Sequence, residues 1–188
     1  MRKKGEIKKN TISKNHRGQV WVETVIYLLI AFIMIGLVLS YVKPKIEDMQ
    51  DQTMIKQSLE IINEIDNTIT TIGSTGNKRL IEVGVKRGEF TIDSTNDKII
   101  FEIQTDYKYS ETGEEVYDGK VKITTEGENQ YSKVRLERDF SEEYDFIYDG
   151  AANNKTLSKA STAYNLFIEN KGVGATPPGL VVIDFTVQ

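Results

Sequence analysis

The sequence predicts an α+β protein. A long N-terminal α-helix, transmembrane in its first half, packs on a C-terminal antiparallel β-sandwich-like head in a lollipop-like layout. An uncharged apolar run lies near the N-terminus, and apolar residues then recur every three or four positions as far as Ile72. Short alternating segments separated by turn residues follow and indicate strands. The predicted segments are a basic leader (1–18), a transmembrane helix (19–43), an amphipathic helix with its linker (44–77) and the head (78–188).

Composition narrows the chemistry and the partners of the chain. Its 188 residues include no cysteine, which excludes disulfides, thiolate nucleophiles, Cys-ligated zinc and iron–sulfur clusters. The net charge of −4 is unevenly spread, because residues 1–18 hold seven Lys or Arg side chains against one glutamate. Residues 19–188 have the opposite balance, 17 basic against 27 acidic side chains. A net positive charge confined to one end argues against a nucleic-acid partner.

The apolar run is predicted to be a membrane-spanning helix. Thr24–Val42 contains 19 residues without a charge, and about 20 apolar residues span a bilayer. Positive charge before the run predicts a cytoplasmic N-terminus and an extracellular location for residues after Lys43. A secretory signal peptide would have a shorter apolar region followed by a small-residue cleavage site, which Ser40–Pro44 does not offer. The alternative, a buried core helix, would contain more polar residues.

Two features of this region do not fit a simple membrane anchor. Glu23 lies one residue before the uncharged run, where an unpaired carboxylate near hydrocarbon is costly and usually has a partner. Gly18 lies where basic sequence turns apolar, and a small residue suits a protease subsite. The stretch Arg17-Gly18-Gln19-Val20-Trp21-Val22-Glu23, followed by a long apolar helix, resembles the class III signal sequence of archaeal type IV pilins.

The resemblance covers residues 17–45, extends loosely to about residue 72, and implies a processing site and partners. In that family a membrane-embedded prepilin peptidase cuts after the glycine on the cytoplasmic side, which places the cut after Gly18 and makes Gln19 the mature N-terminus. Glu23 matches the family's nearly invariant glutamate. The retained helix then packs in the core of a filament of identical or related pilin subunits, with the help of a pilus assembly platform. An adhesive cell-surface filament is the function that the resemblance implies.

Electrostatics agree with this processing. Cleavage would remove the basic leader and leave a free α-amine on Gln19, largely protonated at neutral pH because its reference pKa is about 7.7–8.0. This amine, from the same chain or from a neighbouring subunit, is a candidate partner for Glu23. In a low-dielectric helix bundle such a pair depends strongly on distance and could set the axial register between subunits. The alternative is that Glu23 extends to the lipid headgroups.

Helical periodicity continues past the membrane segment, although Pro44 would normally break or kink a helix. Residues 20–72 are therefore predicted to form one long helix that ends at the glycine-containing stretch Ile72–Asn77. A coiled-coil dimer is less favoured, because the heptad pattern is short. The apolar stripe predicted to face the head comprises Ile46, Met49, Ile55, Leu59, Ile62, Ile65, Ile69 and Ile72, and the opposite face carries Glu47, Asp48, Asp51, Lys56, Glu60, Glu64 and Asp66.

The head is predicted to contain six to eight strands in a sandwich or barrel. Three hairpins are expected, and a loop over Asp149–Lys159 precedes the last of them. The expected hairpins join Leu80–Val85 to Phe90–Asp93, Val116–Thr125 to Tyr131–Arg138, and Ala163–Glu169 to Leu180–Val187, with further strands over Ile99–Tyr109 and Tyr144–Tyr148.

No catalytic, cofactor or metal site is predicted. The single histidine, His16, lies in the predicted leader, so the mature chain would lack the usual histidine and cysteine ligands and nucleophiles. No Asp/Glu pair is distinguished for carboxylate catalysis, and no phosphate-binding loop motif occurs. We therefore expect the chain not to be an enzyme.

Two weaker signals lie in the head. Asn154-Lys155-Thr156 is an N-glycosylation sequon in a polar loop, which makes Asn154 a candidate for glycosylation and the chain a candidate glycoprotein. Short sequons also occur by chance. The oxygen-rich turns Asp93–Asp97 and Asp145–Asn153 could hold calcium, although neither has EF-hand spacing and both also fit ordinary solvated turns.

Together these features predict a pilin precursor, anchored in the membrane by one helix and assembled after cleavage into a surface filament. Heterologous contacts that do not close on themselves generate such filaments. Two alternatives stay open: a single-pass membrane-anchored extracellular binding module that does not polymerise, and a minor pilin that primes filaments.

Overall fold

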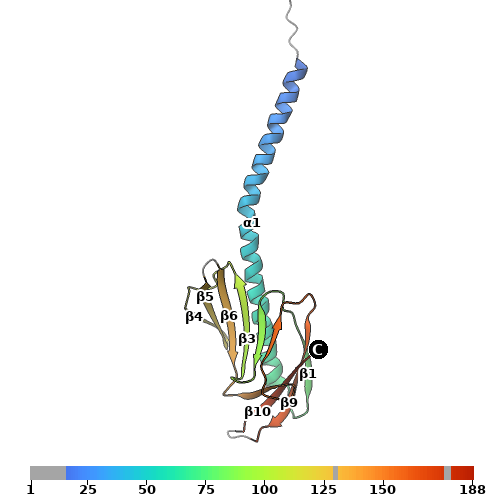
Figure 1. Cartoon of the computed structure of the whole chain (residues 1–188), viewed down its shortest axis with the longest axis vertical. Coiled ribbons are helices and arrows are strands. Elements are labelled where there is room, and N and C mark those ends of the chain that lie inside the picture. The colour runs from blue at the N-terminus through green and yellow to red at the C-terminus, as the bar shows by residue number, and fades with distance from the viewer. Residues whose placement is uncertain (1–15, 129–130, 176–178) are drawn as a thin grey trace, which may run out of the picture. The chain divides into compact units, whose positions relative to one another are not determined.

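The computed structural model describes residues 16–128, 131–175 and 179–188. Helix α1 (His16–Thr71) precedes all the strands, and the chain divides into two compact units, Met1–Ile46 and Glu47–Gln188 (Figure 1). The strands are β1 (Lys78–Val83), β2 (Glu89–Asp93), β3 (Lys98–Thr105), β4 (Glu115–Asp118), β5 (Val121–Glu128), β6 (Tyr131–Asp139), β7 (Tyr144–Tyr148), β8 (Lys155–Ser158), β9 (Tyr164–Val173) and β10 (Val181–Val187).

Helix α1 confirms the predicted long helix and begins four residues earlier than expected. Pro44 lies within it, so the helix continues through the residue that was expected to disturb it. At its C-terminus Gly73 adopts a left-handed backbone conformation with φ 77°, as expected just beyond a helix end. Two side chains satisfy carbonyl groups there: Asn77 Nδ2 donates to the Ile72 oxygen at 2.8 Å, and Asn170 Nδ2 to the Gly73 oxygen at 2.7 Å. These hydrogen bonds explain why the helix stops at this point.

The strands form two sheets, which confirms the predicted sandwich-like architecture. One sheet has four strands in the order β1-β9-β10-β7, and the other has six in the order β4-β5-β6-β3-β2-β8. Nearly all pairs are antiparallel, as predicted, and the exception is the parallel pairing of β10 with β7. The expected pairing of the last two strands is confirmed by the antiparallel ladder between β9 and β10.

The predicted hairpin between Leu80–Val85 and Phe90–Asp93 is wrong. Strand β1 pairs with β9, whereas β2 pairs with β3 and β8 in the other sheet. The segment between them crosses from one sheet to the other and passes close to β3. Gly88 has φ 82°, and a Cβ atom there would collide with the carbonyl oxygen of Glu102. Two strands with alternating apolar and polar residues can be joined by a short glycine-containing link in a hairpin or in a crossover between sheets. Only their pairing partners, which are distant in sequence, show which of these forms.

The described head contains ten strands, not the six to eight that were predicted, and two further assignments need correction. The predicted strand Val116–Thr125 is two strands, β4 and β5, which pair with each other across a turn containing Gly119 at φ 59°. The predicted loop Asp149–Lys159 contains β8, which forms an edge of the six-stranded sheet by pairing with β2. The second predicted hairpin is otherwise confirmed, because β5 and β6 are antiparallel neighbours.

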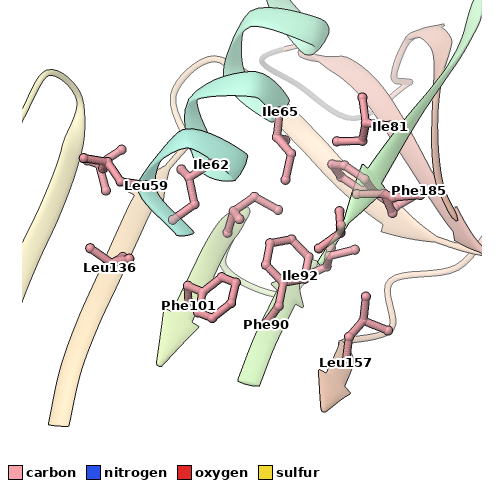
Figure 2. Close-up of a cluster of buried hydrophobic side chains, with 14 of the residues drawn as sticks. Leu59, Ile62, Ile65, Ile81, Phe90, Ile92, Phe101, Leu136, Leu157 and Phe185 are labelled. Atoms are coloured by element: carbon pink, nitrogen blue, oxygen red, sulfur yellow. The ribbon is translucent and has the colours of Figure 1, made fainter. Parts of the chain in front are cut away.

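The core of the second unit combines α1 with the inner faces of both sheets. Figure 2 shows Leu59, Ile62 and Ile65 on the helix together with side chains from several strands. Burial of large aliphatic side chains of this kind stabilises the fold by about 1.5–3 kcal/mol each. The predicted stripe is buried from Ile55 to Ile72, whereas its first two members, Ile46 and Met49, are exposed.

Candidate functional site

The first unit presents an apolar surface that is exposed within the described residues. Most large apolar side chains between Val20 and Val42 are exposed, by 37% at Val42 and by 72% at Tyr41. Within the described residues, α1 alone is long and apolar enough to cross a membrane, and none of its apolar window is buried. A continuous apolar surface of this size requires lipid or other apolar helices around it. The segment is thus compatible with a single-pass membrane anchor.

Polar side chains in the apolar segment are satisfied by the helix itself. The Thr24 hydroxyl donates to the Val20 carbonyl at 2.9 Å, and the Ser40 hydroxyl donates to the Leu37 carbonyl at 3.1 Å. Polar groups that water cannot reach must find hydrogen-bond partners inside the segment, because an unsatisfied donor in hydrocarbon is costly. These hydroxyls therefore do not oppose contact with lipid or with another helix.

Glu23 has one hydrogen-bond donor on its own helix. The Tyr27 hydroxyl, one turn later, donates to Glu23 Oε1 at 3.2 Å. Among the side chains that the structure describes, no cation is paired with this exposed carboxylate. An ionised carboxylate can accept about four hydrogen bonds, so Glu23 keeps acceptor capacity for another group. Sequence reasoning had not identified Tyr27, although its spacing of four residues places it on the same face of a helix.

The predicted processing site is only partly covered by the structure. The backbone of Gly18 and Gln19 belongs to α1. The side chain of Gln19, and residues 1–15 of the predicted leader, lie outside what the structure describes. The proposed cut and the pairing between the Gln19 amine and Glu23 stay predictions.

Asp51 was predicted on the exposed face of the helix, and that prediction is wrong. Its side chain is buried, with 5% of the residue exposed. The carboxylate accepts hydrogen bonds from Arg87 Nη1 and from the Thr105 hydroxyl, and another from the Asp106 backbone N–H at 3.2 Å. It thereby ties α1 to the segment before β2 and to the end of β3. Ile55 lies four residues later on the same helix face, and this spacing could have revealed the burial of Asp51.

Arg138 forms a second polar link between the helix and the head. The residue is buried, and its guanidinium donates to Asp66 Oδ1 at 2.9 Å and to Glu143 Oε1 at 2.8 Å. The same group lies over the Phe140 ring, 4.1 Å from the centroid. The hydrogen bond from Arg138 is the main cause of a lowered pKa at Glu143. Asp51 and Asp66 are fifteen residues apart on α1, about 22 Å at 1.5 Å per residue. The two links therefore attach the helix to the strands at two well-separated points.

The outer face of the six-stranded sheet carries a ladder of ion pairs. Glu102 accepts from Lys133 Nζ at 2.8 Å and from Arg135 Nη1 at 2.7 Å, and Glu137 pairs with Lys98 and with Arg135. Burial by itself would raise the pKa of Glu102, but the hydrogen bond from Lys133 and the two nearby cations lower it. These carboxylates therefore stay ionised at neutral pH.

A hollow of about 470 Å³ adjoins this ladder, at the start of β2, the end of β3 and the start of β6. Its lining includes Arg87, the partner of Asp51, and Lys133, the partner of Glu102. No sequence pattern predicts this hollow, because its lining comes from segments that are distant along the chain.

The candidate glycosylation site lies on an accessible surface. Asn154 is exposed immediately before β8, and its side-chain oxygen accepts hydrogen bonds from the Thr95 N–H and hydroxyl, both at 3.2 Å. The sequon threonine, Thr156, lies in β8 and its hydroxyl is 3.0 Å from that of Thr91. Exposure makes the site reachable by a modifying enzyme, and attachment of a sugar stays a prediction.

The two oxygen-rich turns gain no support as metal sites. In the first, the carboxylate of Asp93 accepts hydrogen bonds from Thr95 N and Asn96 N, at 3.1 and 3.2 Å, and from Asn96 Nδ2 at 2.8 Å. Across the described ranges, no group of three or more His, Asp or Glu side chains is placed to hold a metal ion. The carboxylate of Asp93 thus stabilises its own turn.

No known protein family, curated protein or solved structure matches this chain significantly.

Proposed function

We propose that the chain is the precursor of a structural subunit of an archaeal type IV pilus-like surface filament, used for adhesion. In this proposal a prepilin peptidase cuts after Gly18, and the head lies outside the cell. The apolar helix then leaves the lipid and packs against the same helix of identical or related subunits. The proposal involves no covalent chemistry beyond the cleavage and no cofactor.

The observation that carries the proposal is a carboxylate in an otherwise apolar, uncovered helix. The surface from Val20 to Val42 can be covered by lipid or by sister helices, and both are apolar. Glu23 distinguishes the two, because lipid offers the carboxylate no cation within the hydrocarbon, whereas a bundle of processed subunits offers the α-amine of Gln19. The seven-residue stretch that starts at Arg17 supports the same assignment.

The first experiment determines the N-terminus of the chain isolated from its native membrane, by peptide mass spectrometry. A chain beginning at Gln19, free or cyclised to pyroglutamate, is expected. An intact start at Met1 or Arg2 would remove the basis of the pilin assignment and favour the anchored binding module.

The second experiment tests assembly with a matched pair of variants. Glu23→Ala should abolish filaments seen by electron microscopy, while the protein still inserts in the membrane and is still cleaved. Glu60→Ala removes an exposed glutamate from the same helix beyond the apolar segment and should leave filaments intact. Normal filaments from Glu23→Ala would contradict the pairing role.

The anchored binding module has one specific observation in its favour, the hollow on the outer face of the six-stranded sheet. A module of this kind would stay monomeric in detergent and would be indifferent to Glu23→Ala. A minor, priming pilin would be cleaved at Gly18 but would be scarce relative to the bulk filament subunit.

A further inference from the structure

The hollow beside the ion-pair ladder is lined by side chains that strands β2, β3 and β6 direct away from the core. Glu89, Glu102 and Lys133 alternate along their strands with buried residues, so they lie on the outer face of the sheet. The hollow's volume of about 470 Å³ falls within the range of small-molecule sites. The hollow lies entirely within the second unit.

One cross-strand pair in this hollow consists of two carboxylates. Glu89 lies directly opposite Glu102 in the antiparallel pair of β2 and β3, and like charges in that position are destabilising. Glu102 is balanced by Lys133 and Arg135, whereas no cation is paired with Glu89 among the described side chains. Residues that are unfavourable for the stability of the fold are typical of binding surfaces, where function rather than stability determines the residue.

Several hydrogen-bonding groups in the hollow have no partner within the described ranges. Gln104 is exposed and its amide makes no side-chain hydrogen bond there, and the same holds for the hydroxyl of Tyr131, which is 59% exposed. Arg87 donates through Nη1 to Asp51, and a guanidinium has five N–H donors in all. The hollow thus offers donors, acceptors and one exposed aromatic face together.

The lining is mixed in charge, with three carboxylates and two cations, and it does not favour an anion. A simple anion would face the carboxylates of Glu89, Glu102 and Asp106, and a simple cation would face Arg87 and Lys133. Arg87 and Lys133 are each already paired with a carboxylate, which reduces their attraction for an anion further. A neutral ligand with several hydroxyl groups could use the acceptors and the donors at once.

We propose that this hollow binds a saccharide. The Glu89 carboxylate and the Gln104 amide hydrogen-bond to its hydroxyl groups, Arg87 donates from the opposite side, and the Tyr131 ring packs on the apolar C–H face of the sugar. The site does not depend on polymerisation, because a filament subunit and an anchored module would present the same hollow.

The test uses the full chain in a detergent without a sugar headgroup, such as lauryldimethylamine oxide, because an alkyl glycoside would compete for the site. Methyl glycosides of glucose, galactose, mannose and N-acetylglucosamine are screened by saturation-transfer difference NMR, with inorganic phosphate and cadaverine as the anionic and cationic probes. At least one glycoside is expected to bind in preference to both ions.

Two variants locate the binding. Tyr131→Ala and Glu89→Gln should each weaken the affinity for that glycoside by about tenfold or more. Tyr117→Ala is the matched control, because Tyr117 is 62% exposed on β4 of the same sheet but does not line the hollow. The control should bind as the unaltered chain does, and circular dichroism should show all three variants folded.

Three results would overturn the proposal: no binding of any glycoside, binding that Tyr131→Ala leaves unchanged, or tighter binding of phosphate or cadaverine. Failure here leaves cleavage at Gly18 and filament assembly unaffected, so it is separable from failure of the proposed function.

Discussion

Removal of the Asp51 carboxylate should weaken the attachment of α1 to the strands of the second unit. In Asp51→Ala, three donors lose their acceptor: the Arg87 guanidinium, the Thr105 hydroxyl and the Asp106 N–H. The Arg87 side chain is 47% exposed and can turn to water, so its ion pair contributes only about 0–1 kcal/mol. Thr105 is 2% exposed, and its hydroxyl would lose the acceptor for its proton while its oxygen still accepts from the Tyr107 N–H at 2.9 Å. A buried donor without an acceptor costs about 1–3 kcal/mol.

Together with the partly exposed Asp106 amide, these effects predict a loss of about 3 kcal/mol of unfolding free energy, in which Thr105 has the largest share. Urea denaturation of the full chain in detergent micelles measures this loss. The only tryptophan, Trp21, lies in the apolar segment, so the tyrosine signal in near-ultraviolet circular dichroism is the appropriate probe of the head.

A double-mutant cycle with Thr105→Val measures the energetic coupling between Asp51 and the Thr105 hydroxyl. With the hydroxyl already removed, Asp51→Ala should cost less than it does in the unaltered chain by the Thr105 share, about 1–3 kcal/mol. Equal costs in both backgrounds would show that the Thr105 hydroxyl does not depend on Asp51. A loss below about 0.5 kcal/mol in the single variant would show that the polar link does not stabilise the head, because that is the size expected of an ordinary surface substitution.

Two further predictions concern the sheets. Gly88→Ala should destabilise the chain by about 3 kcal/mol or more, because the left-handed backbone and the adjacent β3 carbonyl both exclude a Cβ atom. A melting temperature equal to that of the unaltered chain would contradict this prediction. Stability should also fall in acid. Burial favours a raised pKa at Glu137, but hydrogen bonds from Lys98 and Arg135 outweigh it, so the folded-state pKa lies below the reference value of 4.5. Such a group stabilises the fold above the reference value, and the contribution is lost as the pH falls through the folded pKa. Melting temperatures should therefore decline below pH 4.5, and less steeply in Glu137→Gln.

The long helix and most strands could be predicted from the sequence because each shows a periodic spacing of apolar residues over a short stretch of chain. The repeat of isoleucines from Ile55 to Ile72 and the alternation in β3 and β6 each report the burial of one face. Strand partners could not be predicted in the same way. β1 pairs with β9, which lies more than eighty residues later in the chain. The next strand, β2, follows β1 after a short link that contains a glycine, and it was predicted as the partner, wrongly.

The same distinction between local and distant contacts applies to the candidate site. Glu23 stands out in sequence because a charge interrupts an apolar context, and its partner Tyr27 is one helical turn away. Asp51 and its partner Arg87 are 36 residues apart, so their contact exists only once the sheets have formed. The lining of the hollow likewise comes from three strands and the segments beside them, and no local pattern marks it.

The place of β10 in the four-stranded sheet has a consequence for how the chain is made. β10 is the last strand in chain order, yet it lies between β9 and β7. During synthesis β7 emerges long before β10, its neighbour in that sheet among the described strands, so the ladder between them cannot form until Val181–Val187 appear. The apolar helix, which emerges first, is therefore available to the membrane insertion machinery while the head is still unable to fold. A ribosome that stalled before residue 181 would release a chain with two open strand edges, which is the kind of surface that chaperones and proteases recognise.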